Sequence, residues 1–183
     1  SVPVPGMNGY TGPQTPRSFF TGAPGFDRFN ADHGSIGYQF SHEFNDAWSI
    51  RQNLRYARQV TDYRQFYFGD FDGNPAVRPD GHTIARTIFA VDEAATIFNV
   101  DNQAQYDAEF GMVKNKLLVG LDYNRWNVDG TTHYGVGPDL DMLNPDYTIP
   151  IELPPIFDDS NQTIGQLGLY AQNQAKIAEL IRL

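Results

Sequence analysis

Apolar and polar side chains alternate with a period of two along much of the chain from residue 35 onward. The pattern is clearest from Trp48 onward. Every second residue from Trp48 to Tyr56 is apolar except for Gln52, and the residues between them are polar. The apolar side carries Trp48, Ile50, Leu54 and Tyr56, and the polar side Ser49, Arg51, Asn53 and Arg55. A period of two predicts a strand with two unlike faces. A face with two arginines does not suit a protein core, so it predicts a wall in contact with water.

The alternation predicts five long strands. They begin near residues 35, 48, 83, 117 and 164, and the last ends near residue 177. The third strand follows the loop 69–82 and is clearest at its end, from residue 98 onward. Residues 45–47 and 111–115 predict tight turns, whereas residues 69–82 and 130–162 predict long polar loops. Short and long connections therefore alternate, as they do in outer-membrane barrels. We expect an all-β antiparallel meander of about five long strands.

The two ends of the chain lack this pattern. Residues 1–33 are rich in Pro, Gly, Asn and Ser and predict an irregular extracellular loop. Residues 34–177 form the expected partial barrel, and residues 178–183 are an uncertain tail. Residues 175–183 also fit a short amphipathic helix, because Ile177, Leu180 and Leu183 have helical spacing. The first residues do not resemble a signal peptide, so we expect an internal piece of a larger protein.

The length of the second strand fits a membrane. Eight positions separate Trp48 from Tyr56, which is about 26 Å along a strand at roughly 3.3 Å per residue. With a tilt near ~40°, the height is about 20 Å, close to the expected separation of two aromatic girdles. Strands longer than the roughly 9–11 residues that cross a bilayer should extend above it as a rim.

Composition narrows the possible functions. The formal net charge is −9, which argues against a nucleic-acid partner because phosphates require a cationic surface. The chain has no cysteine, so disulfides and thiolate metal sites are excluded. The 13 Phe, 10 Tyr and 2 Trp fit girdles or a ligand surface.

Five segments resemble one protein family. They are GYQFSHEF at 37–44, RQNLRY at 51–56, FNVDNQ at 98–103, LVGLDY at 118–123 and GLYAQNQ at 168–174. In this order they resemble strands of TonB-dependent ferric-siderophore receptors of the ferrichrome-receptor type. The resemblance covers most of residues 17–176. It implies part of a 22-stranded barrel in the bacterial outer membrane that is occluded by an N-terminal plug.

The resemblance also implies a function and partners. Such receptors import ferric siderophores by coupling to TonB. We see no plug or TonB-binding box in this chain, so the TonB contact is expected from an absent N-terminal region of the parent protein. Outer-membrane lipid and lipopolysaccharide are the other expected partners. The siderophore is the ligand, and no cofactor is expected.

The same resemblance suggests ligand-binding residues. It places Tyr67 at the extracellular end of the second strand and Tyr134 above the fourth, where the family has ligand-facing aromatic side chains. Tyr63, Phe66 and Trp126 are further candidates. The alternative for each is a place in the outer girdle or in loop packing.

Other chemistry is not indicated. The run from Asp70 to Asn74 resembles a calcium loop but lacks the terminal bidentate glutamate. His42, His82 and His133 lack the spacing of paired metal ligands. We find no nucleophile motif, and therefore expect no catalytic residues, no metal site and no enzyme activity.

Two other interpretations remain open at this point. One is a passive porin-type outer-membrane barrel, and the other is a soluble β-sandwich binding module. A plug domain in the parent protein would favour the receptor, and detergent-free solubility of a monomer would favour the sandwich.

Overall fold

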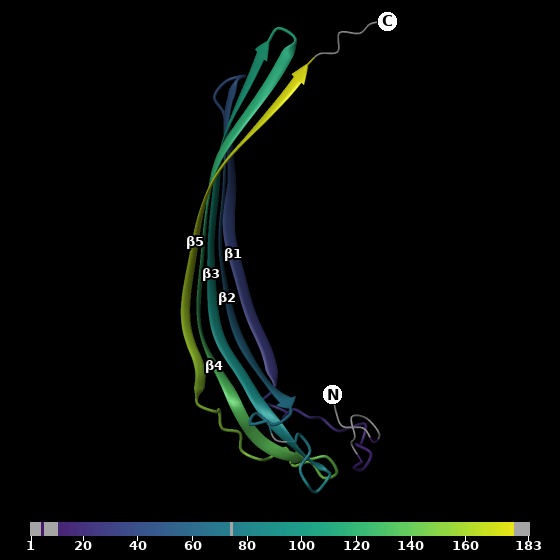
Figure 1. Cartoon of the computed structure of the whole chain (residues 1–183). Coiled ribbons are helices and arrows are strands. Elements are labelled where there is room, and N and C mark those ends of the chain that lie inside the picture. Colours follow the sequence, from purple (N-terminus) through teal and green to yellow (C-terminus); the bar gives the residue numbers. More distant parts are fainter. Residues whose placement is uncertain (1–4, 6–10, 74, 178–183) are drawn as a thin grey trace, which may run out of the picture. The chain divides into compact units, whose positions relative to one another are not determined.

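The computed structural model describes residue 5, residues 11–73 and residues 75–177. Five strands form one sheet in the order β1-β2-β3-β4-β5, so each strand pairs with its sequence neighbours (Figure 1). Their bounds are β1 Arg28–Glu43, β2 Trp48–Phe68, β3 Thr83–Phe110, β4 Val113–Asp141 and β5 Ile156–Ile177. The expected five-stranded antiparallel meander is confirmed. None of the described segments is a helix long and apolar enough to cross a membrane.

Several strands extend further than the sequence suggested. β1 begins at Arg28, inside the segment predicted to be irregular up to residue 33. β4 continues to Asp141 and β5 begins at Ile156, so the predicted loop 130–162 is reduced to residues 142–155. These extensions lack strict alternation, but residues 131–136 contain threonines, an aromatic residue and a valine, which favour strands. The predicted tail 178–183 lies outside the described residues.

Two connections are tight turns. Between β3 and β4 only Gly111 and Met112 lie outside the strands, and Gly111 has a positive φ of 60°. Glycine adopts this backbone conformation without a Cβ clash. The predicted turn 111–115 is therefore shorter than expected. Between β1 and β2 the Asn45 side chain accepts hydrogen bonds from the N–H groups of Ala47 and Trp48, both at 2.9 Å, as in an Asx turn.

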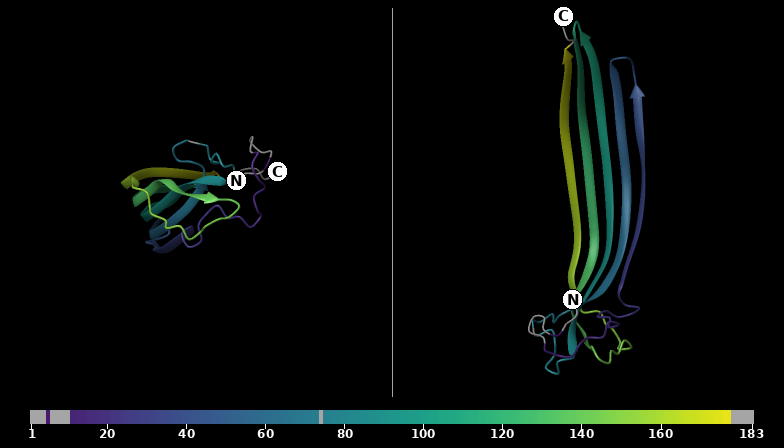
Figure 2. Two further views of the ribbon diagram at one scale, coloured as in Figure 1. Left: turned by 90° about the horizontal axis from the view of Figure 1, so that it is seen from below. Right: turned by 90° about the vertical axis from the view of Figure 1, so that its right-hand side faces the viewer.

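The strands pass through two compact units. Unit 1 comprises residues 1–32, 60–94 and 129–161, and unit 2 comprises residues 33–59, 95–128 and 162–183. The long connections 69–82 and 142–155 and the described N-terminal segment 11–27 all belong to unit 1. Figure 2 shows these segments as irregular ribbon around the ends of β2, β3 and β4 that belong to unit 1.

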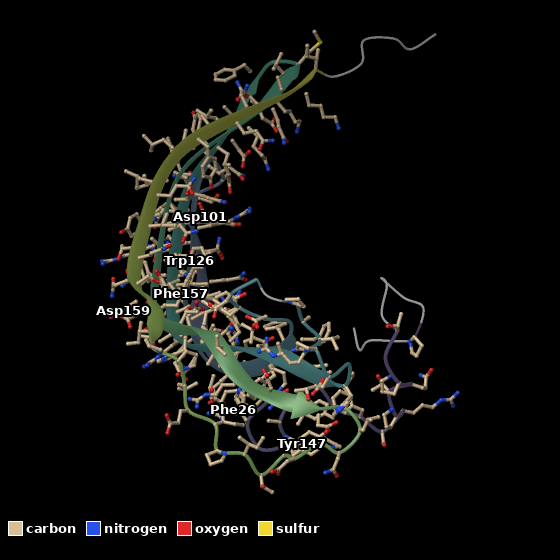
Figure 3. All side chains as sticks on the ribbon, turned by 60° about the horizontal axis from the view of Figure 1, so that its bottom comes forward. Phe26, Asp101, Trp126, Tyr147, Phe157 and Asp159 are labelled. Atoms are coloured by element: carbon tan, nitrogen blue, oxygen red, sulfur yellow. The ribbon has the colours of Figure 1, made fainter. Side chains whose placement is uncertain are left out.

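Unit 1 has hydrophobic cores formed between strands and the segments that cover them. One core contains Ala23, Phe26, Phe66 and Ile88, with Ile151 and Leu153 packed against it. A second contains Ile84, Leu140 and Met142, with Phe19, Phe68, Val77 and Tyr147 packed against it. Phe26 and Tyr147 mark two of the covering segments in Figure 3. These segments fold onto the sheet because they bury apolar side chains there.

The described residues of unit 2 form no comparable core. Among its described residues only Ala57 is buried. Leu121 is 40% exposed, and Ile50, Leu54 and Phe98 are partly exposed rather than interlocked. The described strands form one sheet, not the two packed sheets of the sandwich interpretation. Among the described residues, no second layer therefore covers the apolar side of unit 2.

Polar side chains of different strands in unit 2 form hydrogen bonds with one another. Gln52, the exception on the apolar side of β2, accepts a hydrogen bond from the Tyr38 hydroxyl and donates to Asn102 at 2.5 Å. These contacts satisfy polar atoms that would be costly in an apolar medium. The Tyr170 hydroxyl similarly donates to Asp101 at 2.7 Å.

Gly120 leaves the space that the Tyr170 ring occupies. A Cβ at Gly120 would lie 2.1 Å from Tyr170 Cζ, closer than atoms approach. We predict that Gly120→Ala displaces this ring and weakens its hydrogen bond to Asp101. The expected loss is about 1–3 kcal/mol in the free energy of unfolding, typical of overpacking. Urea unfolding followed by tryptophan fluorescence would measure it.

Gly34→Ala is the matched control, because a Cβ at Gly34 meets nothing within 4 Å. Its effect should stay within about 0.5 kcal/mol. Equal losses in the two variants would contradict the assigned role of Gly120.

Candidate ligand site

Aromatic rings from β2, β3 and β4 meet around Phe89 in unit 1. The Phe89 ring centroid lies 5.9 Å from that of Tyr63, 6.1 Å from that of Tyr67 and 5.8 Å from that of Tyr134. All three pairs are edge-to-face, an arrangement that is favourable for aromatic quadrupoles. Three strands therefore position three of the five predicted ligand residues around one ring.

Three more rings extend this group. Phe71 and Phe157 contact Tyr134 with centroids at 5.0 and 5.6 Å, and Phe29 contacts Tyr63 at 5.8 Å. We call the seven residues the aromatic cluster: Phe29, Tyr63, Tyr67, Phe71, Phe89, Tyr134 and Phe157. Its outer rings keep considerable exposed area, with Tyr67 at 43% and Tyr134 at 38%.

Hydroxyl groups give the aromatic cluster a polar part. The Tyr63 and Tyr67 hydroxyl oxygens lie 3.1 Å apart, and the Tyr63 hydroxyl also donates to the side chain of Gln65. The site thus offers flat apolar faces with a few hydrogen-bonding groups. Apolar faces with a few hydrogen-bonding groups are the contacts that small-molecule ligands use.

The other two predicted ligand residues lie elsewhere. Phe66 is 2% exposed and packs against Phe26, with ring centroids 5.1 Å apart. Its ring is therefore covered in this structure, and a ligand contact of Phe66 stays a prediction. Trp126 is 46% exposed and belongs to unit 2.

Sequence reasoning missed the central residue of the aromatic cluster. Phe89 lies between the predicted loop 69–82 and the clear alternation that starts at Phe98, in the less regular first part of the predicted third strand. Phe29 lay in the segment predicted to be irregular, and Phe157 lay in the loop predicted over residues 130–162. The available signal was the aromatic residues next to each predicted strand, because aromatic residues favour strands. Extending the predicted strands to include them would have found these three residues.

A buried arginine fixes the structure next to the aromatic cluster. Arg86 is 3% exposed, and its guanidinium carbon lies 4.2 Å from the centroid of the Phe66 ring. It donates to the carbonyl oxygens of Pro138 at 2.8 Å and Gly22 at 2.9 Å. These contacts join β3, β4 and the segment 11–27, and they compensate for burial of the guanidinium.

Asp27 secures the same segment from its other end. Its carboxylate accepts hydrogen bonds from the N–H groups of Ala23 and Phe66, both at 3.3 Å. Burial raises the pKa of Asp27 above its usual value, although these hydrogen bonds act in the opposite direction. The carboxylate is therefore costly to ionise where it stands.

The carboxylates of the acidic loop before β3 form ion pairs and hydrogen bonds that hold the loop in place. Asp70 binds Arg78 at 2.6 Å. Asp80 accepts hydrogen bonds from the Thr83 hydroxyl and the N–H groups of Thr83 and His82, which lower its pKa to about 2. No set of three or more potential metal ligands occurs among the described residues.

Comparison with known proteins places this arrangement in a family. The family described as "TonB dependent receptor-like, beta-barrel" matches residues 3–183. The chain belongs to the TonB-dependent receptor β-barrel family. That family consists of transporters and receptors of the bacterial outer membrane and is not an enzyme class.

Several relatives of this chain have names that state a siderophore. The chain is 27% identical over 165 residues to the ferrioxamine B receptor of Salmonella typhimurium, a match of 90% of this chain and 22% of that protein. It is 31% identical over 144 residues to the ferrichrome outer membrane transporter/phage receptor of Escherichia coli, covering 73% and 19%. The ferrioxamine receptor of Yersinia enterocolitica is 32% identical over 123 residues, covering 67% and 16%. The chain thus spans about a fifth of the length of these relatives.

Substitution of Asp27 should give a pH-dependent change in the receptor segment. Because the folded state raises the pKa of Asp27 above 3.8, this group favours folding most at low pH and progressively less as the pH rises through its folded pKa. Asp27→Asn keeps an acceptor for Ala23 and Phe66 but removes the buried charge. Hydrogen exchange of residues 11–27 is measured for both proteins at each pH. At pH 7 these residues should be more protected in Asp27→Asn than in wild type, and near pH 4 the difference between the two proteins should be smaller.

Asp27→Ala is the informative comparison because it removes the acceptor as well. It should lower protection at both pH values. A variant Asp27→Asn that is less protected than wild type at pH 7 would contradict the account.

Proposed function

We propose that this chain is the ligand-capturing part of an outer-membrane receptor that imports ferric siderophores by TonB-coupled active transport. The aromatic cluster in unit 1 is the observation that supports it most directly. Tyr63, Tyr67 and Tyr134 contact the ring of Phe89 there. The names of the relatives, which are receptors for ferrioxamines and ferrichrome, support the same ligand class.

The chemistry of the aromatic cluster suits such a ligand. A siderophore already surrounds its iron with donor atoms, so the receptor has no need to supply metal ligands. What it needs is apolar area to desolvate the organic shell and a few hydrogen-bonding groups to orient it. The rings of Tyr67 and Tyr134 supply exposed area, and the hydroxyls of Tyr63 and Tyr67 supply polar groups.

The remaining partners follow from the same proposal. Coupling to TonB belongs to the whole receptor. Outer-membrane lipid and lipopolysaccharide contact the apolar side of the strands. The rings of Trp48 and Tyr106 contact each other at a tilt, with centroids 4.7 Å apart, next to the β1–β2 turn, in keeping with a girdle at one membrane interface. We propose no enzyme activity and no cofactor, and turnover in a panel of hydrolase substrates would contradict this.

Removal of the central ring tests the proposal. In the full-length receptor that contains this chain, Phe89→Ala should weaken ferrichrome or ferrioxamine B binding by about 10- to 30-fold. An aromatic anchor at a binding site typically contributes roughly 2 kcal/mol or more. Binding to purified receptor can be followed by the quenching of tryptophan fluorescence.

Phe98→Ala is the matched control on the same strand, because Phe98 belongs to unit 2 and contacts Tyr123 instead. It should leave affinity within about 2-fold, a difference below roughly 0.5 kcal/mol. If Phe89→Ala and Phe98→Ala have equal effects, or if the wild-type receptor binds neither chelate, the proposed function is wrong.

A further inference from the structure

Glu93 is an acidic side chain on the same side of β3 as Phe89. Residues at even separations along a strand share a face, so Phe89, Val91 and Glu93 point the same way. Glu93 is partly buried and lies about 13 Å along the strand from Phe89, at roughly 3.3 Å per residue. Within the described part of the chain its carboxylate has no hydrogen bond or ion pair.

A glycine makes room beside this carboxylate. A Cβ at Gly130 of β4 would lie 3.3 Å from Glu93 Cγ and 3.4 Å from Glu93 Cβ. Gly130 shares its face of β4 with Tyr134, four residues further on. The Glu93 side chain therefore lies along the sheet on the side that carries the Phe89–Tyr134 contact.

Adjacent Asp92 is in a different situation. It points to the opposite side of β3 by the same alternation, and its carboxylate lies 3.5 Å from the Arg64 guanidinium. One of the two neighbouring acids is thus neutralised and the other is not. Exposed carboxylates of unit 1 such as Asp159 also have no partner, but among its described carboxylates Glu93 alone is both partly buried and unpaired.

Most cations of unit 1 are already engaged. Arg28 binds Asp62 at 2.5 Å, and Arg78 binds Asp139 at 2.7 Å. Arg86 is buried against backbone carbonyls. Among the described residues of unit 1, Arg17 alone of the five arginines lacks such a contact, and it lies in the N-terminal segment. The described part of the site therefore has little positive charge for an anionic ligand.

We infer that Glu93 is a specificity-determining residue whose carboxylate pairs with a positively charged group of the siderophore held by the aromatic cluster. This inference rests on the proposed function and names the charge class of its ligand. Aromatic faces attract cations, and a nearby carboxylate adds a direct partner. The receptor should therefore prefer a ferric chelate with a protonated amine to its uncharged analogue.

Two chelates that differ only in this charge provide the test. The first is the ferric complex of a linear trihydroxamate with a terminal primary amine, and the second is the same complex with the amine acetylated. Affinities are measured on the full-length receptor in detergent, at low and high salt. Wild-type receptor should bind the amine form about 10-fold more tightly at low salt, and the preference should shrink as salt screens the pair.

Glu93→Gln should weaken binding of the amine form by about 10-fold and leave the acetylated form unchanged. Asp92→Asn is the matched control and should leave both affinities unchanged, since that carboxylate faces away and is paired with Arg64. Rescue by Glu93→Asp, in part, would show that the charge and not the shape of the side chain matters.

The outcomes separate the two proposals. If the wild-type receptor binds both chelates but Glu93→Gln changes neither, or changes both equally, the role of Glu93 is refuted and the proposed function stands. If the wild-type receptor binds neither chelate, the proposed function and the inference fall together. If it prefers the acetylated form, the charge class assigned here is wrong.

Discussion

Backbone hydrogen bonding between neighbouring strands is the interaction on which the structure depends. Each strand of the sheet pairs with its sequence neighbour, and in unit 2 only Ala57 of the described residues is buried. Without a second layer, the ladder and the contacts between adjacent side chains hold the strands together. Such a sheet suits a membrane barrel, where every backbone group must be satisfied between strands and the two faces meet different media. Within this chain β1 and β5 are edges, which a closed barrel pairs with further strands.

Unit 1 has buried side-chain contacts in addition to the hydrogen bonds between its strands. Its covering segments bury Phe66, Ile88 and Met142, and Arg86 ties three of its segments through backbone carbonyls. Fixing these segments restricts the strand ends that carry the aromatic cluster. A preorganised group of rings loses less conformational entropy on binding than a mobile one. The apolar side chains in the loops of unit 1 thus help to hold the aromatic cluster, which is the ligand site that we propose, in one arrangement.

The period of two was enough to predict the number of strands, their order and both tight turns. It failed where alternation is broken, as at the start of β1 (residues 28–34) and at the end of β4 near Pro138, because pairing with a neighbouring strand can extend a strand beyond its own pattern. Tyr63, Tyr67 and Tyr134 were predicted from family resemblance, and the structure brings them together. Phe89 was missed because contacts between strands decide its role, and no local pattern encodes them. The burial of Phe66 was not predicted for a similar reason, since the segment that buries it lies far away in sequence.

The central claim is that each strand has one side for lipid and one for a water-filled lumen. Single-cysteine scanning of residues 49–56 in the full-length receptor tests it most directly, because this chain contains no cysteine of its own. In outer-membrane vesicles a charged, membrane-impermeant thiol reagent should label positions 49, 51, 53 and 55, while a lipid-soluble reagent should label positions 50 and 54. Reactivity that does not alternate, or protection at positions 50 and 54 from both reagents, would contradict the account.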